Sequence, residues 1–131
     1  DKTHSMVIVG AGNLGQAIVN SEDFAKRGFI IRGVFDNNKE LDGRKIGEHQ
    51  IMMSDRLPQF IKDENIEILA ITVPKDAARE VARVAVEAGI KAIWNFAHTD
   101  INVPDNIVVE NVHLSESLMR LSYNMANHAN Q

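Results

Sequence analysis

The stretch of sequence that decides the fold is Met6-Val7-Ile8-Val9-Gly10-Ala11-Gly12-Asn13-Leu14-Gly15. Residues 6–9 form a short apolar run, which is typical of a buried strand, and the run ends at a glycine-rich turn. The residues that follow place Leu14, Ala17 and Ile18 on one helical face, so the turn joins a strand to a helix. At such a junction the spacing G-x-G-x-x-G is typical of a turn that holds the phosphates of a dinucleotide.

Each glycine of this turn has its own expected role. Gly10 permits the tight turn, Gly12 leaves room for a pyrophosphate to approach the backbone, and Gly15 lets the helix pack closely on the strand. The N–H groups near Asn13 and Leu14, together with the helix dipole, would face the phosphates. The predicted cofactor-binding turn therefore consists of Gly10, Ala11, Gly12, Asn13, Leu14 and Gly15.

An acidic residue follows the turn at the expected distance. Asp36 comes 21 residues after Gly15, at the end of a second apolar run, Ile30 to Phe35. A carboxylate there accepts hydrogen bonds from ribose hydroxyls and repels a 2′-phosphate. Because Asn37 and Asn38 follow it rather than arginine, the sequence favours NAD over NADP. Three nearby basic residues keep NADP open as an alternative: Lys39, Arg44 and Lys45.

Strands and helices alternate along the rest of the chain. Further strands are expected at His49–Met53, Ile66–Val73, Ile90–Phe96 and Ile107–Val112, and further helices at Leu57–Asp63, Lys75–Ala88 and Ser115 to about Ala126. Continuous apolar strands are buried on both faces, which favours a parallel sheet with helices on either side. We therefore predict an α/β fold, a Rossmann-like doubly wound and mostly parallel sheet, as one dinucleotide-binding domain over residues 1–131.

The composition excludes several classes of function. The chain has 131 residues, a net charge of -4 and no cysteine, so disulfides and thiolate metal sites are excluded. A mildly acidic domain is a poor candidate for binding nucleic acid by itself. The apolar runs are too short to span a bilayer, and residues 1–5 resemble no signal peptide. We expect a soluble, cytoplasmic protein without membrane contact.

Two other strand ends are expected beside the cofactor, because ligands of open parallel sheets lie across the carboxyl ends of the strands. Asn95 would contact a carboxamide, and Phe96 would form an apolar wall for a nicotinamide. For single residues a plainer interpretation stays open, in which Pro74 only ends a strand and Phe96 belongs to the core. The predicted pocket walls are Thr72, Val73, Pro74, Asn95, Phe96 and Ala97.

The residues needed for catalysis or metal binding are missing. The single tyrosine, Tyr123, is followed four positions later by Asn127 rather than lysine, and the five histidines show no metal-binding spacing. His98 is the one plausible acid or base, although a surface histidine in a loop is the simpler interpretation. We predict no catalytic residues and no metal site, and hence a nucleotide-binding module rather than an enzyme.

The final predicted helix carries an apolar seam. Leu114, Leu118, Leu121 and Met125 recur at spacings of four, three and four. Such a seam can pack on the domain's own sheet or on a second chain, and the pattern leaves both open.

The residues quoted above, from Val7 to Ala17, resemble the cofactor-binding turn of the Rex family of redox-sensing transcriptional repressors. The resemblance continues in order along nearly the whole chain, through Lys26-Arg27-Gly28-Phe29, Phe35-Asp36, Gly43-Arg44-Lys45-Ile46-Gly47, Ile71-Thr72-Val73-Pro74, Glu87-Ala88-Gly89-Ile90-Lys91, Asn95-Phe96-Ala97, Val103-Pro104 and Asn111-Val112-x-Leu114-Ser115. Asn37, Lys45 and Ile46 are also among the expected cofactor-binding residues.

The resemblance implies an NADH- and NAD+-sensing regulatory domain of a homodimeric repressor that releases DNA when NADH binds. It also implies that operator DNA is bound only through an N-terminal winged-helix domain, which this sequence does not contain. The final helix, residues 113–131, would then be exchanged between subunits. The implied dimer interface is Leu114, Leu118, Leu121 and Tyr123.

Three positions depart from the family pattern. Ser21 and His113 stand where the family often has a tyrosine and an aspartate that pair across the dimer, and His98 stands where it often has proline. Both residues of that pair are replaced here, so the pair cannot form in its usual way. The alternative function is the nucleotide-binding half of an NAD-dependent dehydrogenase or reductase. A module for coenzyme A is disfavoured, because its 3′-phosphate would meet the charge of Asp36.

Overall fold

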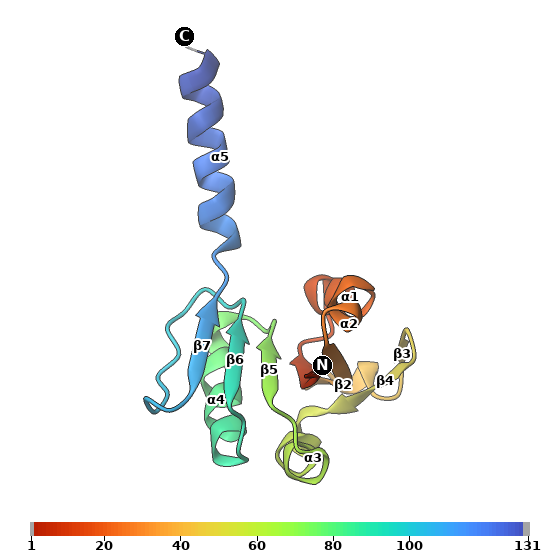
Figure 1. Cartoon of the computed structure of the whole chain (residues 1–131). Coiled ribbons are helices and arrows are strands. Elements are labelled where there is room, and N and C mark those ends of the chain that lie inside the picture. The colour runs from red at the N-terminus through yellow and green to blue at the C-terminus, as the bar shows by residue number, and fades with distance from the viewer. Residues whose placement is uncertain (1, 130–131) are drawn as a thin grey trace.

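The computed structural model describes residues 2–129, and their side chains except those of residues 114–116 and 129. The chain forms a seven-stranded sheet flanked by helices (Figure 1). The strands are β1 (His4–Val9), β2 (Phe29–Asp36), β3 (Lys45–Ile46), β4 (His49–Met53), β5 (Ile68–Ile71), β6 (Ala92–Asn95) and β7 (Val108–Asn111). The helices are α1 (Asn13–Val19), α2 (Asp23–Lys26), α3 (Leu57–Glu64), α4 (Lys75–Glu87) and α5 (Leu114–Ala129).

The order of the strands creates a switch point. Along the sheet the order is β3-β4-β2-β1-β5-β6-β7, and every neighbouring pair is parallel except β3 and β4. The chain first adds strands on one side of β1 and then, from β5 onward, on the other side. In such sheets ligands bind at this reversal, outside the carboxyl ends of the strands. The predicted α/β class with a doubly wound, mostly parallel sheet is confirmed.

One face of the sheet is covered by α3, α4 and the crossover between β6 and β7. Val7, Leu69 and Ile93 point to this face from the central strands and lie in one buried cluster with the apolar residues of both helices. The crossover, residues 96–107, contains no helix, yet it adds Ala97, Ile101 and Val103 to the same core. An irregular segment thus does the covering work that a crossover helix does in most parallel sheets.

The opposite face is covered only in part. α1 and α2 pack over β1 and β5 through a cluster that includes Met6, Ile8 and Ile18. Within residues 2–129 no helix lies on this side of β6 and β7 (Figure 1). An apolar hollow of about 330 Å³ opens there, with Phe24, Ile68, Trp94 and Val108 among its walls and Arg27 and Glu110 at its polar edge. Parallel sheets are normally covered on both faces, so this layer is incomplete in a single chain.

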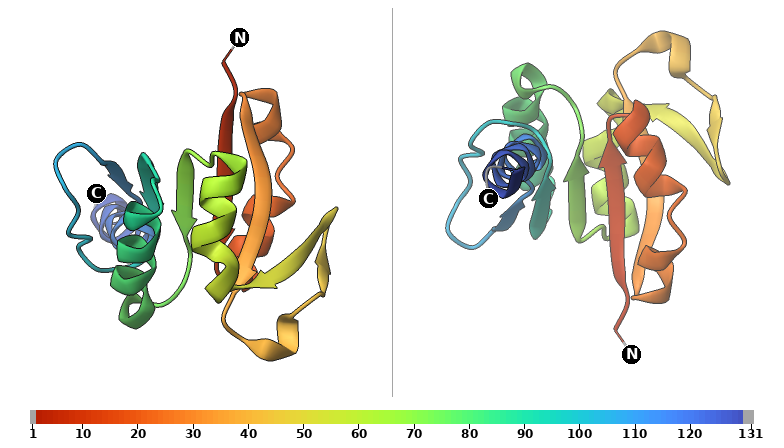
Figure 2. Two further views of the ribbon diagram at one scale, coloured as in Figure 1. Left: turned by 90° about the horizontal axis from the view of Figure 1, so that it is seen from below. Right: turned by 90° about the horizontal axis from the view of Figure 1, so that it is seen from above.

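α5 leaves the body of the molecule at the end of β7 and projects away from the sheet, as Figures 1 and 2 show. Leu118, Leu121 and Tyr123 are more than half exposed on it, at 67%, 55% and 67%. The link between β7 and α5 is Val112-His113 alone, and the helix continues outward from the end of the sheet instead of turning back over it (Figure 1). Of the two alternatives for the apolar seam, packing on the domain's own sheet is therefore wrong for the described side chains.

Two short elements were not indicated by the sequence pattern. α2 spans four residues and β3 spans two, which is only about one period of each repeat, so neither gives a periodic signal. β3 pairs antiparallel with β4 and forms a hairpin at one edge of the sheet. The last helix also extends to Ala129, beyond the expected end near Ala126.

The buried side chains of β5 should dominate stability. Leu69 is fully buried at the centre of the sheet, and we expect Leu69→Ala to lower the free energy of unfolding by about 2–5 kcal/mol. The exposed Gln50→Ala on β4 is the control and should change it by less than about 0.5 kcal/mol. Urea unfolding followed by circular dichroism measures both, and equal effects would contradict a β5 that is buried on both faces.

Candidate functional site

The glycine turn between β1 and α1 is packed too tightly to accept side chains at two of its positions. Gly10 has φ +114°, and a Cβ on it would lie 2.3 Å from Thr72 Oγ1. A Cβ on Gly15 would lie 1.9 Å from the carbonyl oxygen of Gly10. Both approaches are far below van der Waals contact, so these two glycines are required by the fold itself, as the sequence predicts.

Gly12 is different, because nothing lies within 4 Å of where its Cβ would be. It precedes α1 with φ −80° and ψ −160°, an extended conformation that other residues also adopt. The fold therefore gives no reason for a glycine at this position, whereas a ligand that approaches the backbone would. Asn13, the first residue of α1, is exposed beside it, and no side chain caps the start of the helix.

Asp36 is tied directly to this turn. Its Oδ2 accepts a hydrogen bond from the Ala11 N–H at 2.8 Å, and its Oδ1 accepts one from the Asn38 N–H at 2.9 Å. The Gly10 N–H donates to the carbonyl of Phe35 at 2.7 Å, which joins the ends of β1 and β2. Each carboxylate oxygen keeps accepting capacity, so the half-buried Asp36 can hold the turn and still receive hydroxyl donors.

Thr72 closes the other side of the switch point. Its hydroxyl lies 2.8 Å from the carbonyl oxygen of Gly10 and 3.1 Å from that of Val9, so it fastens the end of β5 to the turn. Val73 is half-buried in the core formed with α3 and α4, and the exposed Pro74 precedes the first residue of α4. The structure thus brings the predicted segment 72–74 beside the glycine turn.

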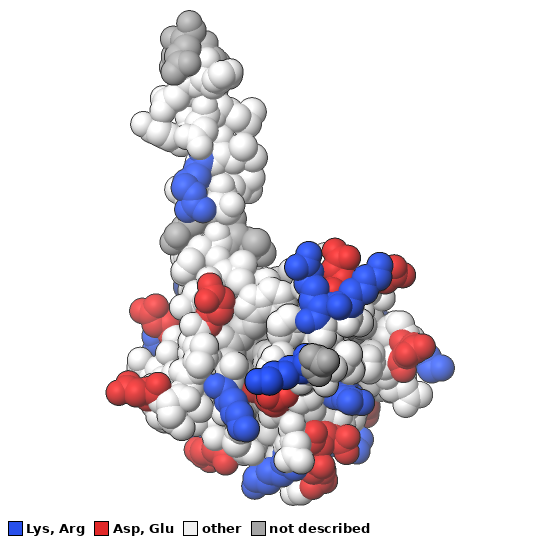
Figure 3. All heavy atoms as spheres, viewed as in Figure 1, with Lys and Arg blue, Asp and Glu red and all other residues white. Residues whose placement is uncertain are grey.

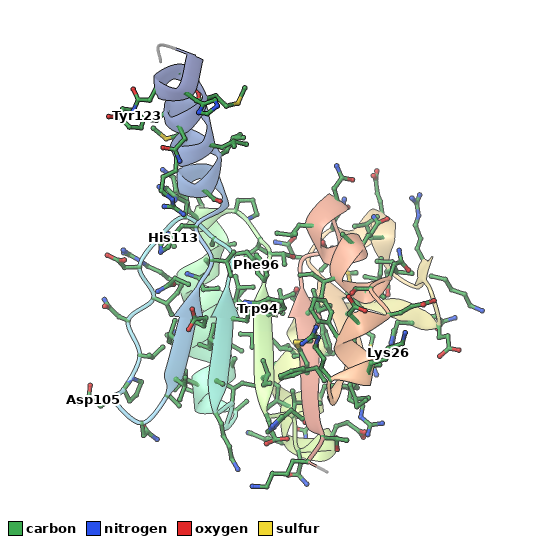
Figure 4. All side chains as sticks on the ribbon, turned by 45° about the horizontal axis from the view of Figure 1, so that its top comes forward. Lys26, Trp94, Phe96, Asp105, His113 and Tyr123 are labelled. Carbon is green, nitrogen blue, oxygen red and sulfur yellow. The ribbon has the colours of Figure 1, made fainter. Side chains whose placement is uncertain are left out.

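The end of β6 presents an aromatic pair. Trp94 on β6 and Phe96 just after it have ring centroids 4.6 Å apart, and Figure 4 shows Phe96 nearer to the end at which α5 begins. Phe96 packs with the cluster under α1 that includes Leu14, whereas Ala97 joins the core on the opposite face. Phe96, just after β6, and Leu14 of α1 therefore pack against the same buried cluster.

Asn95 points inward instead of outward. It is 1% exposed, and both hydrogens of its amide are used, by the Thr99 carbonyl at 3.1 Å and by Asn111 Oδ1 at 2.9 Å. Its Oδ1 accepts a hydrogen bond from the Ala97 N–H at 3.0 Å. The predicted contact between this amide and a carboxamide of a ligand is therefore not supported by its orientation, since no donor is left over.

The remaining predicted residues lie around the hairpin and on α5. Ile46 is buried in a small cluster with Ala11 and Val34, which holds the hairpin beside the glycine turn. Asn37 and Lys45 are exposed nearby. Of the predicted dimer residues, Leu118, Leu121 and Tyr123 are exposed, whereas the side chain of Leu114 lies outside the described residues.

Two further features concern catalysis and metal binding. His98 is exposed in the crossover, and among the described residues no group of three or more His, Asp or Glu side chains could hold a metal ion. None of the helices in this part is both long and apolar enough to cross a bilayer.

Comparison with protein families matches residues 1–99 to the CoA-binding domain. The chain is 50% identical over 125 residues to the redox-sensing transcriptional repressor Rex of Clostridioides difficile, covering 95% of this chain and 60% of the relative. A Rex from Caldanaerobacter subterraneus subsp. tengcongensis is 48% identical over 125 residues, with 95% and 56% covered. The chain thus spans less than two thirds of the length of these relatives.

The chain is also similar to solved structures of a Rex-family repressor. RSP, a Rex-family repressor, superposes in complex with β-NADH with a TM-score of 0.93 at 46% identity, covering 98% of this chain and 62% of that chain. Its complex with β-NAD+ and operator DNA gives the same TM-score and identity, covering 98% of this chain and 59% of that chain.

The two kinds of glycine in the turn make a testable contrast. We expect Gly15→Ala to destabilise the fold by more than about 2 kcal/mol, because its Cβ would collide with the Gly10 carbonyl. Gly12→Ala has open space and should change the free energy of unfolding by less than about 1 kcal/mol. Thermal unfolding of both variants measures this, and a Gly15→Ala variant as stable as the parent would refute the packing described for the turn.

Proposed function

The chain belongs to the CoA-binding domain family, in the group formed by the Rex repressors, and on this premise we propose that it is the NADH- and NAD+-sensing domain of a transcriptional repressor. The observation that carries the proposal is the glycine turn, where nothing lies within 4 Å of the place that a Cβ on Gly12 would take, while Asp36 is held beside the turn. A Rex-family repressor of 46% identity has been solved with β-NADH and with β-NAD+, which supports a dinucleotide in this place.

In the proposed complex each part of the dinucleotide has a partner. The pyrophosphate lies over Gly12 and the N-terminus of α1, where backbone N–H groups attract anions. The adenosine ribose hydroxyls donate to Asp36, whose charge disfavours a 2′-phosphate. Asn37, Lys45 and Ile46 flank that end. The nicotinamide end extends across the switch point toward Thr72, Val73, Pro74 and Phe96.

The two redox forms differ in the charge of the nicotinamide ring. The ring of NAD+ is a cation, and transfer of a cation into an apolar pocket costs desolvation energy that the neutral ring of NADH does not incur. The apolar side chains of Val73 and Phe96 therefore favour NADH. A sensor needs nothing more than such a difference, provided that NADH binds one arrangement of the protein better than another.

The proposed role is regulation, not catalysis. The relatives are transcriptional repressors, and the carboxylate of Asp36 at the glycine turn is tied by hydrogen bonds from the Ala11 and Asn38 N–H groups. Contact with operator DNA would occur only through a separate winged-helix domain, which fits the net charge of -4. A repressor of this kind acts in the cytoplasm, where its operator lies. The alternative is the nucleotide-binding half of an NAD-dependent dehydrogenase or reductase.

Homodimerisation is the second part of the proposal. α5 projects with exposed apolar side chains, and the β6–β7 half of the sheet has an open apolar hollow. Figure 3 shows few charged side chains on the visible face of the projecting helix, while the body carries both signs of charge. An apolar helix and an uncovered apolar face in the same chain can both be buried if two copies exchange their α5 helices. Residues 113–131 would then be the dimerisation segment.

Titration calorimetry with NADH, NAD+, NADPH and coenzyme A tests the cofactor assignment. We expect NADH to bind more tightly than NAD+, and the two phosphorylated ligands to bind weakly because of Asp36. Gly12→Val should weaken NADH binding by at least about tenfold while the fold is kept, since its side chain fills the space over the turn. Ala17→Val places the same valine side chain at an exposed position of α1, away from the turn, and is the control.

Three results would decide against this assignment. Equal affinities for NADH and NAD+ would favour the dehydrogenase fragment, and preference for coenzyme A would overturn the NAD(H) assignment. No binding of any of the four ligands would leave the glycine turn with a purely architectural role.

The dimer is tested on the exposed seam of α5. Leu121→Glu should raise the dimer dissociation constant by at least about tenfold, because a charge would be buried in an apolar contact. Ser122→Glu introduces the same charge one residue later, on an adjacent face of the helix, and should have a smaller effect. Sedimentation velocity over a range of concentrations measures both constants. A parent chain that stays monomeric, or equal effects of the two variants, would contradict the proposed interface.

A further inference from the structure

One polar side chain of the described part of the chain is buried: Asn95, at the end of β6. Its amide group is fully hydrogen-bonded, with Thr99 and Asn111 as acceptors and the Ala97 N–H as donor. Loss of any partner would leave a buried polar atom unsatisfied, which costs more than an exposed hydrogen bond contributes. The segments that meet at Asn95 are therefore held to one another more firmly than surface loops usually are.

The first of these segments belongs to the proposed cofactor site. Residues 96–99 follow β6 at the carboxyl end of the sheet and begin with Phe96, which packs against the buried cluster under α1 and lies with its ring centroid 4.6 Å from that of Trp94. The Asn95 amide fixes this segment at Ala97 and at Thr99. Its continuation is fixed from the other side, where Arg79 of α4 donates to the Asp100 carbonyl at 3.1 Å.

The second segment is the base of α5. Asn95 contacts it twice, through its amide to Asn111 Oδ1 at 2.9 Å and through its carbonyl, which accepts from the Val112 N–H at 2.8 Å. Val112 lies two residues before the first residue of α5. One buried residue thus joins the wall of the cofactor site to the start of the helix that the dimer would use.

We propose that Asn95 is a positioning residue that couples the cofactor site to α5, so that binding of NADH changes the stability of the dimer interface. The proposal rests on the proposed function. A ring that packs beside Phe96 displaces residues 96–99, and the amide of Asn95 must follow the Thr99 carbonyl or lose that hydrogen bond. The same amide then pulls on Asn111, and the motion reaches α5 through the two-residue link.

A purely local role for Asn95 would not need the contact with Asn111. The bonds to Ala97 and Thr99 already close the turn that follows β6. The bond to Asn111 instead reaches a residue 16 positions further along the chain, on the exposed edge strand β7. Asn111 is itself exposed, so its substitution can cut this one connection without a cavity in the core.

The test measures linkage rather than affinity alone. For the full chain, the dimer dissociation constant is determined by sedimentation velocity with saturating NADH and with saturating NAD+, and their ratio is the coupling. We expect a coupling of at least about fivefold in the parent chain. Asn111→Ala removes the acceptor, and the ratio of the two dimer dissociation constants should then be less than about twofold. The NADH affinity of this variant should change by less than about threefold.

Two further variants separate coupling from simple structural damage. Asn111→Asp keeps an oxygen acceptor for the Asn95 amide and should retain the coupling of the parent chain. Asn106→Ala removes the same side chain from an exposed position in the crossover and should also retain it. Amide hydrogen exchange at residues 97–99 and 112–113 gives a second readout, and only Asn111→Ala should accelerate exchange in both segments.

Each unfavourable outcome has a distinct meaning. Failure of the parent chain to bind NADH would refute the proposed function, and the coupling with it. A parent chain that binds NADH but has the same dimer dissociation constant in both redox forms would overturn the coupling alone. An unchanged ratio in Asn111→Ala would also overturn it, even if the variant dimerises less tightly with both ligands, because the contact would then be merely structural.

Discussion

The fold and the candidate site both depend on the close approach of backbone segments at the switch point of the sheet. The Gly10 carbonyl lies where a side chain on Gly15 would have to be, and it receives the hydroxyl of Thr72. Asp36 ties the end of β2 to the same turn through the Ala11 N–H. Because β1, β2 and β5 are joined at one point by short contacts, the surface above them has its shape before any ligand arrives, which lowers the entropic cost of binding.

Features that are encoded locally could be predicted from the sequence. The glycine turn, Asp36 and the alternating apolar runs are each legible within a short stretch, and they specify the parallel sheet and the phosphate end of the site. The orientation of Asn95 could not be predicted, because Asn111 becomes its partner only through the register of β6 and β7. The open face of the sheet could not be predicted from the sequence either. Apolar periodicity indicates that a face is buried, but it does not indicate whether the same chain or a second chain covers that face.

The departures from the family pattern change where redox discrimination would originate. Where the Rex resemblance implies a tyrosine and an aspartate that pair across the dimer, this chain has the half-buried Ser21 and, at the base of α5, His113. These two side chains supply no phenol and no carboxylate, so the usual pair cannot form. In the proposed function more of the discrimination then falls on the apolar wall around Phe96 and on the amide network of Asn95 beside it.

The order of the projecting helix α5 also depends on the concentration of the protein. α5 has 16 residues, and isolated helices of that length are only marginally stable in water. Its described large apolar side chains are exposed, so they gain no burial against the body of their own chain; they are Leu118, Met119, Leu121, Tyr123 and Met125. In the proposed dimer the order of α5 therefore rises with the number of protein molecules available to pair. If synthesis of this protein falls, fewer copies are present and a larger share of them is monomeric. The concentration of the proposed dimer would therefore fall more steeply than the total concentration of the chain.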